Sequence, residues 1–440
     1  MALDFPRASL VDGIRFSTQI AIPGVVLGLF KKRALPTQFA STLHADHLGY
    51  LLVQGMVRRF GPDPFYVRVV KDQALLVHHP DDIALVLGGS PEPFASDPDA
   101  KRKGMAAFQP NALTISRGDL WANRRRFAEA VLDTRQPLHR LAPRFLDVVR
   151  DEAEVLAGHQ TLRWPELNAG FGRLTRRVVF GDAAANDEAL TAQLDELMSA
   201  ANKMPGRQPE GYDDFVRHVE SYVAAREPGS LCSLFADAPS DAATDVAGQV
   251  AHWLFAMGDT LPANLLRTLA LLAAHPLQLA EVRAELEAGD LACAQGVAGL
   301  DYLAGCIQEA MRLWPTTALF GRVTTSEVRF PTGAVLPEGT QVLIYNVFNH
   351  RNRDRVPFAD RFAPQEWVSG DAPSDWSFNF FSHGPQGCPG AGLSLFLGQA
   401  LIARLLRDSD PQLSGASLDP ARALPYGLDV FALAIRLDPR

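Results

Sequence analysis

The chain has 440 residues, of which 47% are apolar and 21% are charged, so a large buried core is expected. The net charge of −8 and the absence of a basic stripe argue against a nucleic-acid partner. The apolar run at 20–30 is too short for a membrane-spanning helix, which needs about 20 residues. We therefore expect a soluble cytoplasmic protein without a membrane-spanning helix.

The N-terminal part of the chain shows three different textures. Residues 1–40 contain three prolines and no sustained period, so we expect an irregular N-terminal segment. Helical spacing covers 41–59, and then two short apolar runs at 65–70 and 74–79 flank a polar turn, which predicts a β-hairpin. Residues 89–119 are rich in Pro, Gly and charged residues, which predicts a long loop.

The rest of the chain is mostly helical in pattern. Periodic segments lie at 119–132, 141–157, 165–180, 186–202, 212–226, 276–288 and 300–313. A longer helix is predicted from about Asp241 to Ala274, with Ser240 or Asp241 as N-cap; at ~1.5 Å per residue it spans about 50 Å. Short strands are expected at 321–330 and 341–346, and a hairpin at 424–437. These patterns indicate a mainly α protein with a small β region, in a single domain over residues 1–440.

One glycine-punctuated loop contains the most informative cysteine. It reads Phe381-Ser-His-Gly384-Pro-Gln-Gly-Cys388-Pro-Gly390 and runs into an apolar helical segment. Most free cysteines are small buried hydrophobes. Cys388, however, opens a helix, whose N–H groups and dipole stabilise a thiolate. An anionic sulfur on a tight turn suits an axial ligand of iron.

Three further motifs carry possible chemistry. Glu309 and Arg312 are neighbours on one helix face; such pairs are usually solvated, but this helix is apolar on both sides of the pair. Asp259-Thr260 lies at the centre of the long apolar helix, where an unpaired acid is costly; a kink at Pro262 without catalytic meaning is the alternative. The third motif is Trp121-Ala-Asn-Arg124-Arg125-Arg126, in which only one arginine can face a given partner.

These motifs, in this order, resemble the cytochrome P-450 superfamily of haem-thiolate monooxygenases, in its soluble bacterial type, over essentially the whole chain. The resemblance implies the cytochrome P-450 fold, a single triangular-prism-like domain with a long central helix. It also implies haem b as cofactor, with Cys388 as axial ligand of the iron. Glu309 and Arg312 match the family's structural pair, which ties their helix to the loop ahead of the cysteine.

The resemblance also assigns roles to other positions. Trp121, Arg125 and Arg322 match residues that hold the haem propionates. In the family an acid relays protons and a threonine holds dioxygen, and Asp259 and Thr260 match that pair. Further cofactor contacts are implied for Phe381, Gln386 and Gly390.

Five positions depart from the family's pattern. Pro262 removes an N–H from the long helix, so we expect it to kink or widen the helix locally. Met257 stands where a glycine is usual, Gln386 where an arginine or histidine is usual, and Glu366 where an arginine normally completes the Glu–Arg network. Pro389 lacks an N–H that could bond the cysteine sulfur, so we expect a more electron-rich thiolate and a lower iron potential than with another residue there.

The implied reaction inserts one oxygen atom of O2 into a small apolar organic substrate, by hydroxylation or epoxidation, with electrons from a ferredoxin or flavodoxin. Two alternatives stay open: a peroxide-driven peroxygenase, isomerase or dehydratase on the same haem site, and a non-catalytic haem-binding carrier or sensor. The substrate is not determined. Aligned position alone gives the candidate pocket residues Leu254, Phe255, Met257, Gly258, Thr317, Leu319 and Tyr426.

Overall fold

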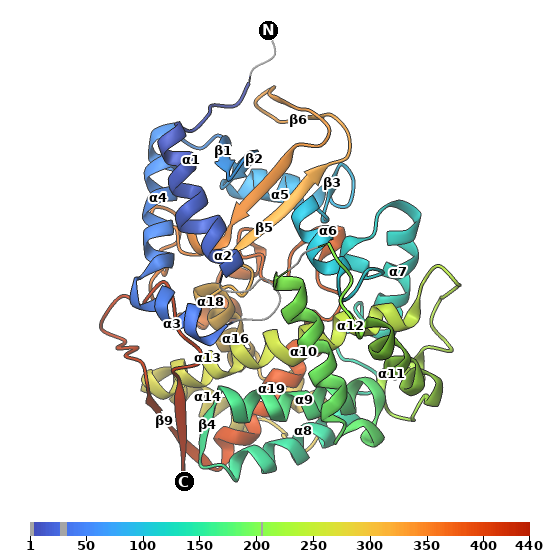
Figure 1. The fold of residues 1–440 in the computed structure, drawn as a ribbon. Coiled ribbons are helices and arrows are strands. Elements are labelled where there is room, and N and C mark those ends of the chain that lie inside the picture. The colour runs from blue at the N-terminus through green and yellow to red at the C-terminus, as the bar shows by residue number, and fades with distance from the viewer. Residues whose placement is uncertain (1–3, 27–32, 204–205) are drawn as a thin grey trace.

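A computed structural model describes residues 4–26, 33–203 and 206–440 (Figure 1). Helices make up most of it. In chain order they are α1 (Leu10–Phe16), α2 (Ile22–Val26), α3 (Ala34–Thr42), α4 (Ala45–Phe60), α5 (Pro80–Gly88), α6 (Asp99–Ala106), α7 (Gly118–Val131), α8 (Ala142–Ala157), α9 (Trp164–Phe180), α10 (Glu188–Lys203), α11 (Tyr212–Ala225), α12 (Val246–Phe255), α13 (Leu261–Ala274), α14 (Pro276–Ala288), α15 (Ala294–Ala298), α16 (Asp301–Leu313), α17 (Asn346–Asn349), α18 (Gln365–Val368) and α19 (Ala391–Arg407).

The strands form three small sheets. They are β1 (Phe65–Val69), β2 (Asp72–Val77), β3 (Phe94–Ala95), β4 (Thr161–Arg163), β5 (Leu319–Thr324), β6 (Val328–Arg329), β7 (Val335–Leu336), β8 (Gln341–Tyr345), β9 (Ser409–Ser414) and β10 (Ala434–Pro439). The largest sheet has the order β1-β2-β8-β5-β3, with β2 and β8 parallel and the other pairs antiparallel. The other two sheets have the orders β4-β10-β9 and β6-β7.

Figure 1 shows the helices α8, α9, α13, α14 and α19 gathered at one end and the largest sheet with α1 and α4 at the other. The main apolar cluster lies among the helices, and two smaller clusters lie on the sheet. The predicted hairpin at 65–79 is confirmed as β1–β2. The seven helices predicted between 119 and 226 and between 276 and 313 are confirmed within two residues at each end, and the helix predicted at 41–59 begins four residues later, at Ala45.

The long helix begins later than predicted. It runs from Val246 to Ala274 with a π-helical turn at Ala256–Thr260, and at ~1.5 Å per residue it is about 44 Å long. Its N-cap is Asp245, whose side chain accepts a 3.1 Å hydrogen bond from the Gly248 N–H. A side-chain oxygen at this position satisfies a helix N–H that has no partner within the helix, which is why the helix starts here and not at 241.

Three other expectations were wrong. Residues 10–26 and 34–42 are helical, although prolines suggested an irregular segment; Pro36 lies in the first turn of α3, where its missing N–H costs nothing. The predicted loop 89–119 contains α6 and β3. The predicted hairpin at 424–437 does not form, because β10 pairs with the distant strands β4 and β9. That residues 1–440 form one domain stays a prediction.

Candidate functional site

The cysteine loop is fixed by its own backbone. The Cys388 N–H donates to the Phe381 carbonyl at 2.7 Å, and the Thr134 hydroxyl donates to the Pro389 carbonyl at 2.7 Å. Gly384 has φ of +68°, and a Cβ there would lie 2.5 Å from the Leu87 carbonyl oxygen. Glycine is therefore required at this turn, and the turn sets the direction in which the cysteine points.

Cys388 is enclosed by protein and yet exposed. Burial raises the pKa of its thiol, while the Gly390 N–H and the Arg125 guanidinium act in the opposite direction. Its surface is nevertheless accessible, and so is that of Gly392 one turn further along. A Cβ built on Gly392 would meet nothing within 4 Å. Both properties hold together only if this turn borders open space inside the molecule.

The long helix has an accessible stripe too. Four partly accessible residues recur at helical spacing: His252, Phe255, Ala256 and Asp259. The residues between them, Trp253, Leu254 and Met257, are buried in the main apolar cluster. A Cβ on Gly258 would meet nothing within 4 Å. One face of this otherwise buried helix therefore borders open space.

The helix is locally wide where the acid and threonine lie. Asp259 and Thr260 belong to the π-helical turn, so the local widening predicted at Pro262 is confirmed. Pro262 has no N–H to donate to the Gly258 carbonyl one turn back. The Asn168 side chain, on α9, donates to that carbonyl at 2.9 Å instead. Sequence reasoning missed Asn168, because nothing local to it marks its partner 90 residues away.

A buried arginine near the cysteine loop has no acidic partner. Arg322 is 3% exposed and donates to the Ser90 hydroxyl at 2.9 Å and to the Gly321 carbonyl at 3.1 Å. Its guanidinium lies 4.4 Å from the Phe320 ring centroid. Within the described part of the chain no carboxylate contacts it. Burial lowers the pKa of the Arg322 guanidinium to about 9, and no negative charge among the described residues offsets this effect.

The arginines of the basic motif on α7 have different partners. Arg125 donates to the Gly387 carbonyl, next to the cysteine, and to the Glu129 carboxylate, both at 2.6 Å. Arg124 is buried and donates to the Ser116 hydroxyl at 2.8 Å. Trp121, one turn before Arg125, is partly accessible. Arg125 thus contacts the cysteine loop, and its predicted role in holding a haem propionate stays a prediction.

The Glu309–Arg312 pair is fully buried and bidentate, with N–O distances of 2.6 and 2.8 Å. Glu309 also accepts from the Ala363 N–H at 3.0 Å and from the Trp367 indole N–H at 2.8 Å. Trp367 therefore completes the network, and Glu366, at the position where an arginine was expected, has no part in these bonds. The sequence contained a signal for this contact, since the indole N–H of Trp367 can donate a hydrogen bond to a carboxylate as a guanidinium does.

The remaining pocket candidates have other surroundings. Thr317 accepts a hydrogen bond at its carbonyl from Asn346, and Leu319 pairs with Tyr345 in the sheet. Tyr426 is buried against α4, with its ring 4.9 Å from that of His47 and beneath the Arg351 guanidinium. Their place in a substrate pocket stays a prediction.

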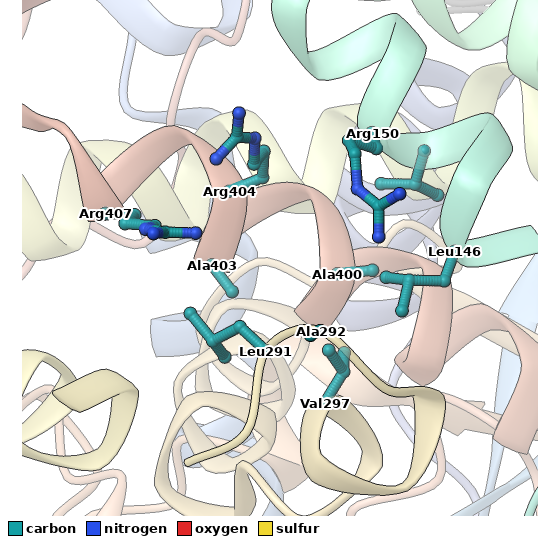
Figure 2. Close-up of a pocket in the computed structure, with 10 residues that line it drawn as sticks. Leu146, Arg150, Leu291, Ala292, Val297, Ala400, Ala403, Arg404 and Arg407 are labelled. Atoms are coloured by element: carbon teal, nitrogen blue, oxygen red, sulfur yellow. The ribbon is translucent and has the colours of Figure 1, made fainter. Parts of the chain in front are cut away.

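A separate surface pocket of 340 Å³ lies between α8, the segment after α14 and the far end of α19 (Figure 2). Arg150, Arg404 and Arg407 surround an apolar floor that includes Ala403. Ala403 is twelve residues along α19 from its first residue, which is about 18 Å. This pocket therefore lies apart from the cysteine turn.

Comparison with known proteins gives the family. A family model described as cytochrome P-450 matches residues 231–417, which contain Asp259, Glu309, Arg312 and Cys388. The cytochrome P-450 monooxygenase helB1 of Aspergillus fumigatus is 25% identical over 93% of this chain and 77% of its own length. These matches assign residues 231–417 to the cytochrome P-450 superfamily, and the likeness to helB1 extends over most of the chain. Among solved structures, a retinoic acid-bound cyanobacterial CYP120A1 has the same fold, with a TM-score of 0.71 and 18% identity over 88% of this chain and 94% of that one.

Other relatives match over shorter segments. Cytochrome P-450 4c3 of Drosophila melanogaster is 28% identical over 45% of this chain, and cytochrome P-450 4A22 of Homo sapiens is 31% identical over 37%. The alignments cover 38% and 32% of those two relatives, so the chain spans about a third of their length there. In the described ranges no helix has the length and hydropathy that a membrane span requires.

Cytochromes P-450 bind haem through a cysteine thiolate, and the residues of this chain fit that group. Cys388 is accessible and the space around Gly392 is open, and within the described residues buried Arg322 has no anionic partner. The haem carries two propionates, so it offers such an anion. The Gln386 side-chain oxygen is also buried and has no hydrogen-bond partner among the described residues, so its amide group can reorient toward a ligand.

A second group of cations lies next to Arg322 and was missed in the sequence. Burial lowers the pKa of Lys101 to about 7, and the nearby positive charge of Arg322 contributes to the same shift. Among the described residues, the Asp97 carboxylate opposes this effect, but it is already paired with Arg102 at 2.6 Å and with Arg117 at 2.8 Å. The cluster therefore has an excess of positive charge that suits a dianionic cofactor.

Proposed function

We propose that this protein is a haem-thiolate monooxygenase in which Cys388 is the axial ligand of the iron. The observation that carries the proposal is the position of Cys388, which is enclosed by the protein but exposed to space within it. The accessible stripe of the long helix supplies a candidate distal wall. The bound haem iron would supply activation of O2 and insertion of one oxygen atom into a small organic substrate, with electrons from a ferredoxin or flavodoxin.

The residues of the chain then bind and orient the group. The Cys388 thiolate is held by the loop backbone and favoured by the Gly390 N–H and by Arg125. Arg322 supplies a buried guanidinium for one propionate, and Lys101 adds positive charge beside it. Trp121, Arg125 and the Gln386 amide are the further propionate contacts, with Phe381 and Gly390 next to the cofactor in the loop.

Proton delivery is assigned to the π-helical turn. Thr260 is partly accessible, and its hydroxyl holds a proton at the Oγ1 atom in this assignment. Asp259, the next residue, is partly accessible as well and passes protons inward from its carboxyl group. The wide turn, which the Asn168 bond to the Gly258 carbonyl supports, leaves room for dioxygen beside Gly258.

The test of the ligand is the absorption spectrum of the reduced protein with carbon monoxide. A thiolate-ligated haem gives a Soret band at a markedly longer wavelength than a histidine-ligated haem. We expect that band in the wild type and in Cys232→Ala, and its loss in Cys388→Ala. Cys232 is a matched control because it is fully buried in the core. A long-wavelength band that survives in Cys388→Ala contradicts the proposal.

The oxygen source is tested separately. If Asp259 relays protons, Asp259→Asn lowers product formation driven by NAD(P)H, reductase and ferredoxin by about 10²-fold or more, the usual contribution of a positioned acid or base. Turnover with peroxide should change much less. Product formation with peroxide and none with the electron-transfer partners would favour the peroxygenase, and no turnover with either would favour a haem carrier or sensor.

A further inference from the structure

One histidine on the accessible stripe of the long helix takes no part in the chemistry assigned so far. His252 is on α12, two turns before Asp259 and on the same face. Burial lowers its pKa to about 4, with a smaller effect from Lys101, so the imidazole is neutral near pH 7. It is nevertheless partly accessible, so, like Cys388, it borders open space within the molecule.

One ring nitrogen of this histidine is already engaged. Nδ1 lies 3.0 Å from the Gln109 side-chain oxygen. Because that oxygen only accepts, Nδ1 carries the proton and donates, which leaves Nε2 with a bare lone pair. Gln109 is fully buried, which restricts its side chain, so it serves as a positioning residue for His252; its amide nitrogen has no partner within the described part of the chain.

The second ring nitrogen is not engaged by the protein. Among the described residues no hydrogen bond to Nε2 is made, and Nε2 is not one of the atoms sealed off from accessible space. Besides Gln109 and Lys101, aromatic side chains lie near the imidazole. The Phe255 ring lies 6.0 Å from the imidazole, and the Phe108 ring lies 6.0 Å from Phe255. One hydrogen-bond acceptor is therefore presented from an aromatic surface.

We propose that His252 is a specificity-determining residue whose Nε2 accepts a hydrogen bond from a hydroxyl group of the substrate. The substrate class is then an apolar molecule that already carries an alcohol. This deepens the proposed function, on which it rests, because it places the hydroxyl two turns along the helix from Asp259 and so away from the carbon that is oxidised.

A carboxylate is a poorer match than an alcohol. A neutral imidazole with its proton on Nδ1 turns a lone pair toward the ligand and repels a second acceptor. The nearby Lys101 ammonium has its three protons on the Ser96 carbonyl and on the carbonyl and hydroxyl of Thr114, at 2.6–3.2 Å. It has no proton left to donate to an anionic substrate.

The test compares alcohols with their parent hydrocarbons in the oxidised holoprotein. Menthol and p-menthane, and cedrol and cedrane, are titrated while the Soret band is followed. Binding of an alcohol oxygen to the iron itself shifts the spin state in the opposite direction, so that mode is recognised. The ratio of the two dissociation constants in each pair reports the hydrogen bond, since the carbon skeleton is the same.

We expect His252→Leu to reduce the preference for the alcohol by about 2- to 12-fold, the range that one neutral hydrogen bond gives. His252→Gln keeps a polar end and should retain most of the preference. Phe255→Leu changes the adjoining surface without touching Nε2 and should leave the ratio unchanged within about 2-fold.

The proposal is overturned if His252→Leu leaves the ratio unchanged in both pairs, or if a matched carboxylic acid binds more tightly than the alcohol and depends on His252. The readout is binding and not turnover, so it is independent of whether O2 or peroxide drives the reaction. It is also independent of the carbon monoxide spectrum that tests Cys388, so the two proposals fail separately.

Discussion

Single hydrogen-bond donors decide two features of the site. The indole N–H of Trp367 reaches the buried Glu309 carboxylate, so the network is complete although Glu366 stands where an arginine was expected. In the cysteine loop the opposite change occurs, since Pro389 withholds a donor from the sulfur while the Gly390 N–H remains. In both places the number of N–H groups around a negative charge matters more than the residue name.

Trp367→Phe keeps the ring and removes the N–H. Because Glu309 is fully buried and charged, we expect a loss of about 1.5–3 kcal/mol in the free energy of unfolding, seen as a lower thermal midpoint. Trp314→Phe is the matched control, since its indole donates at 3.0 Å to the neutral Pro425 carbonyl and should cost only about 0.5–1.5 kcal/mol. Equal losses in the two variants would contradict a charged network around Glu309.

Pro389→Ala restores a backbone N–H next to the thiolate. A hydrogen bond that is stronger by about 0.5–1.5 kcal/mol in the ferrous than in the ferric state raises the iron potential by about 20–60 mV, since one electron converts about 1.4 kcal/mol into 59 mV. Redox titration measures it, with Pro385→Ala in the same loop as control. An unchanged or lower potential contradicts this account of the loop.

At the scale of elements, a π-helical turn at Ala256–Thr260 divides the long helix into α12 and α13. Pro262 and the small residue Gly258 produce a π-helical turn, and α9 contributes the donor that the proline lacks. The Asn264 side chain donates to the Thr260 carbonyl at 3.1 Å within the same turn. The acid and threonine therefore sit on a widened turn that side-chain amides from two helices stabilise.

Asn168→Leu removes the α9 donor and keeps a similar volume. We expect a loss of about 1–3 kcal/mol in the free energy of unfolding, because the Gly258 carbonyl then lacks its partner. We also expect more hydrogen peroxide released per NAD(P)H consumed, since a relaxed turn aligns Asp259 and Thr260 less well. Thermal unfolding and peroxide assays measure the two effects. If neither changes, the bond has no structural role.

At the scale of the molecule, several histidines are buried in the neutral form. Burial lowers the pKa of His350 to about 3 and that of His78 to about 4. His350 Nδ1 bonds the Arg312 carbonyl, and His78 Nε2 bonds the Asp63 carbonyl. His350 lies beside the buried Glu309–Arg312 pair, and His78 lies at the end of β2. Protonation of the two histidines therefore disturbs two separate parts of the fold.

Stability should therefore fall in mild acid. Above a pH of about 6.5 both histidines are neutral in the folded and unfolded chain; below it the unfolded chain binds the protons first. Each histidine then removes about 1.4 kcal/mol per pH unit until its folded pKa is reached. Thermal midpoints between pH 7 and pH 5 measure the slope, and His78→Phe should reduce it. A slope that His78→Phe leaves unchanged contradicts the assignment to His78.

The sequence predicted most helices and the cysteine loop because periodicity and turn residues are local signals. It did not predict contacts that join distant segments. The pairing of β10 with β4 and β9 and the bond from Asn168 to Gly258 depend on packing that no local pattern encodes. His252 and Gln109 were missed for the same reason: each is an ordinary polar residue until the fold brings them 3.0 Å apart.

The shared carbonyl of Gly258 couples two positions that are 94 residues apart in the chain. Pro262→Ala adds an N–H that can bond this carbonyl within the helix, so it makes the Asn168 amide redundant. In a double-mutant cycle the two substitutions should then be epistatic, with Asn168→Leu costing less in the Pro262→Ala background than alone. Substitutions of Asn168 should accordingly be tolerated better once Pro262 is replaced, which links the shape of the π-helical turn to α9, a helix outside the site.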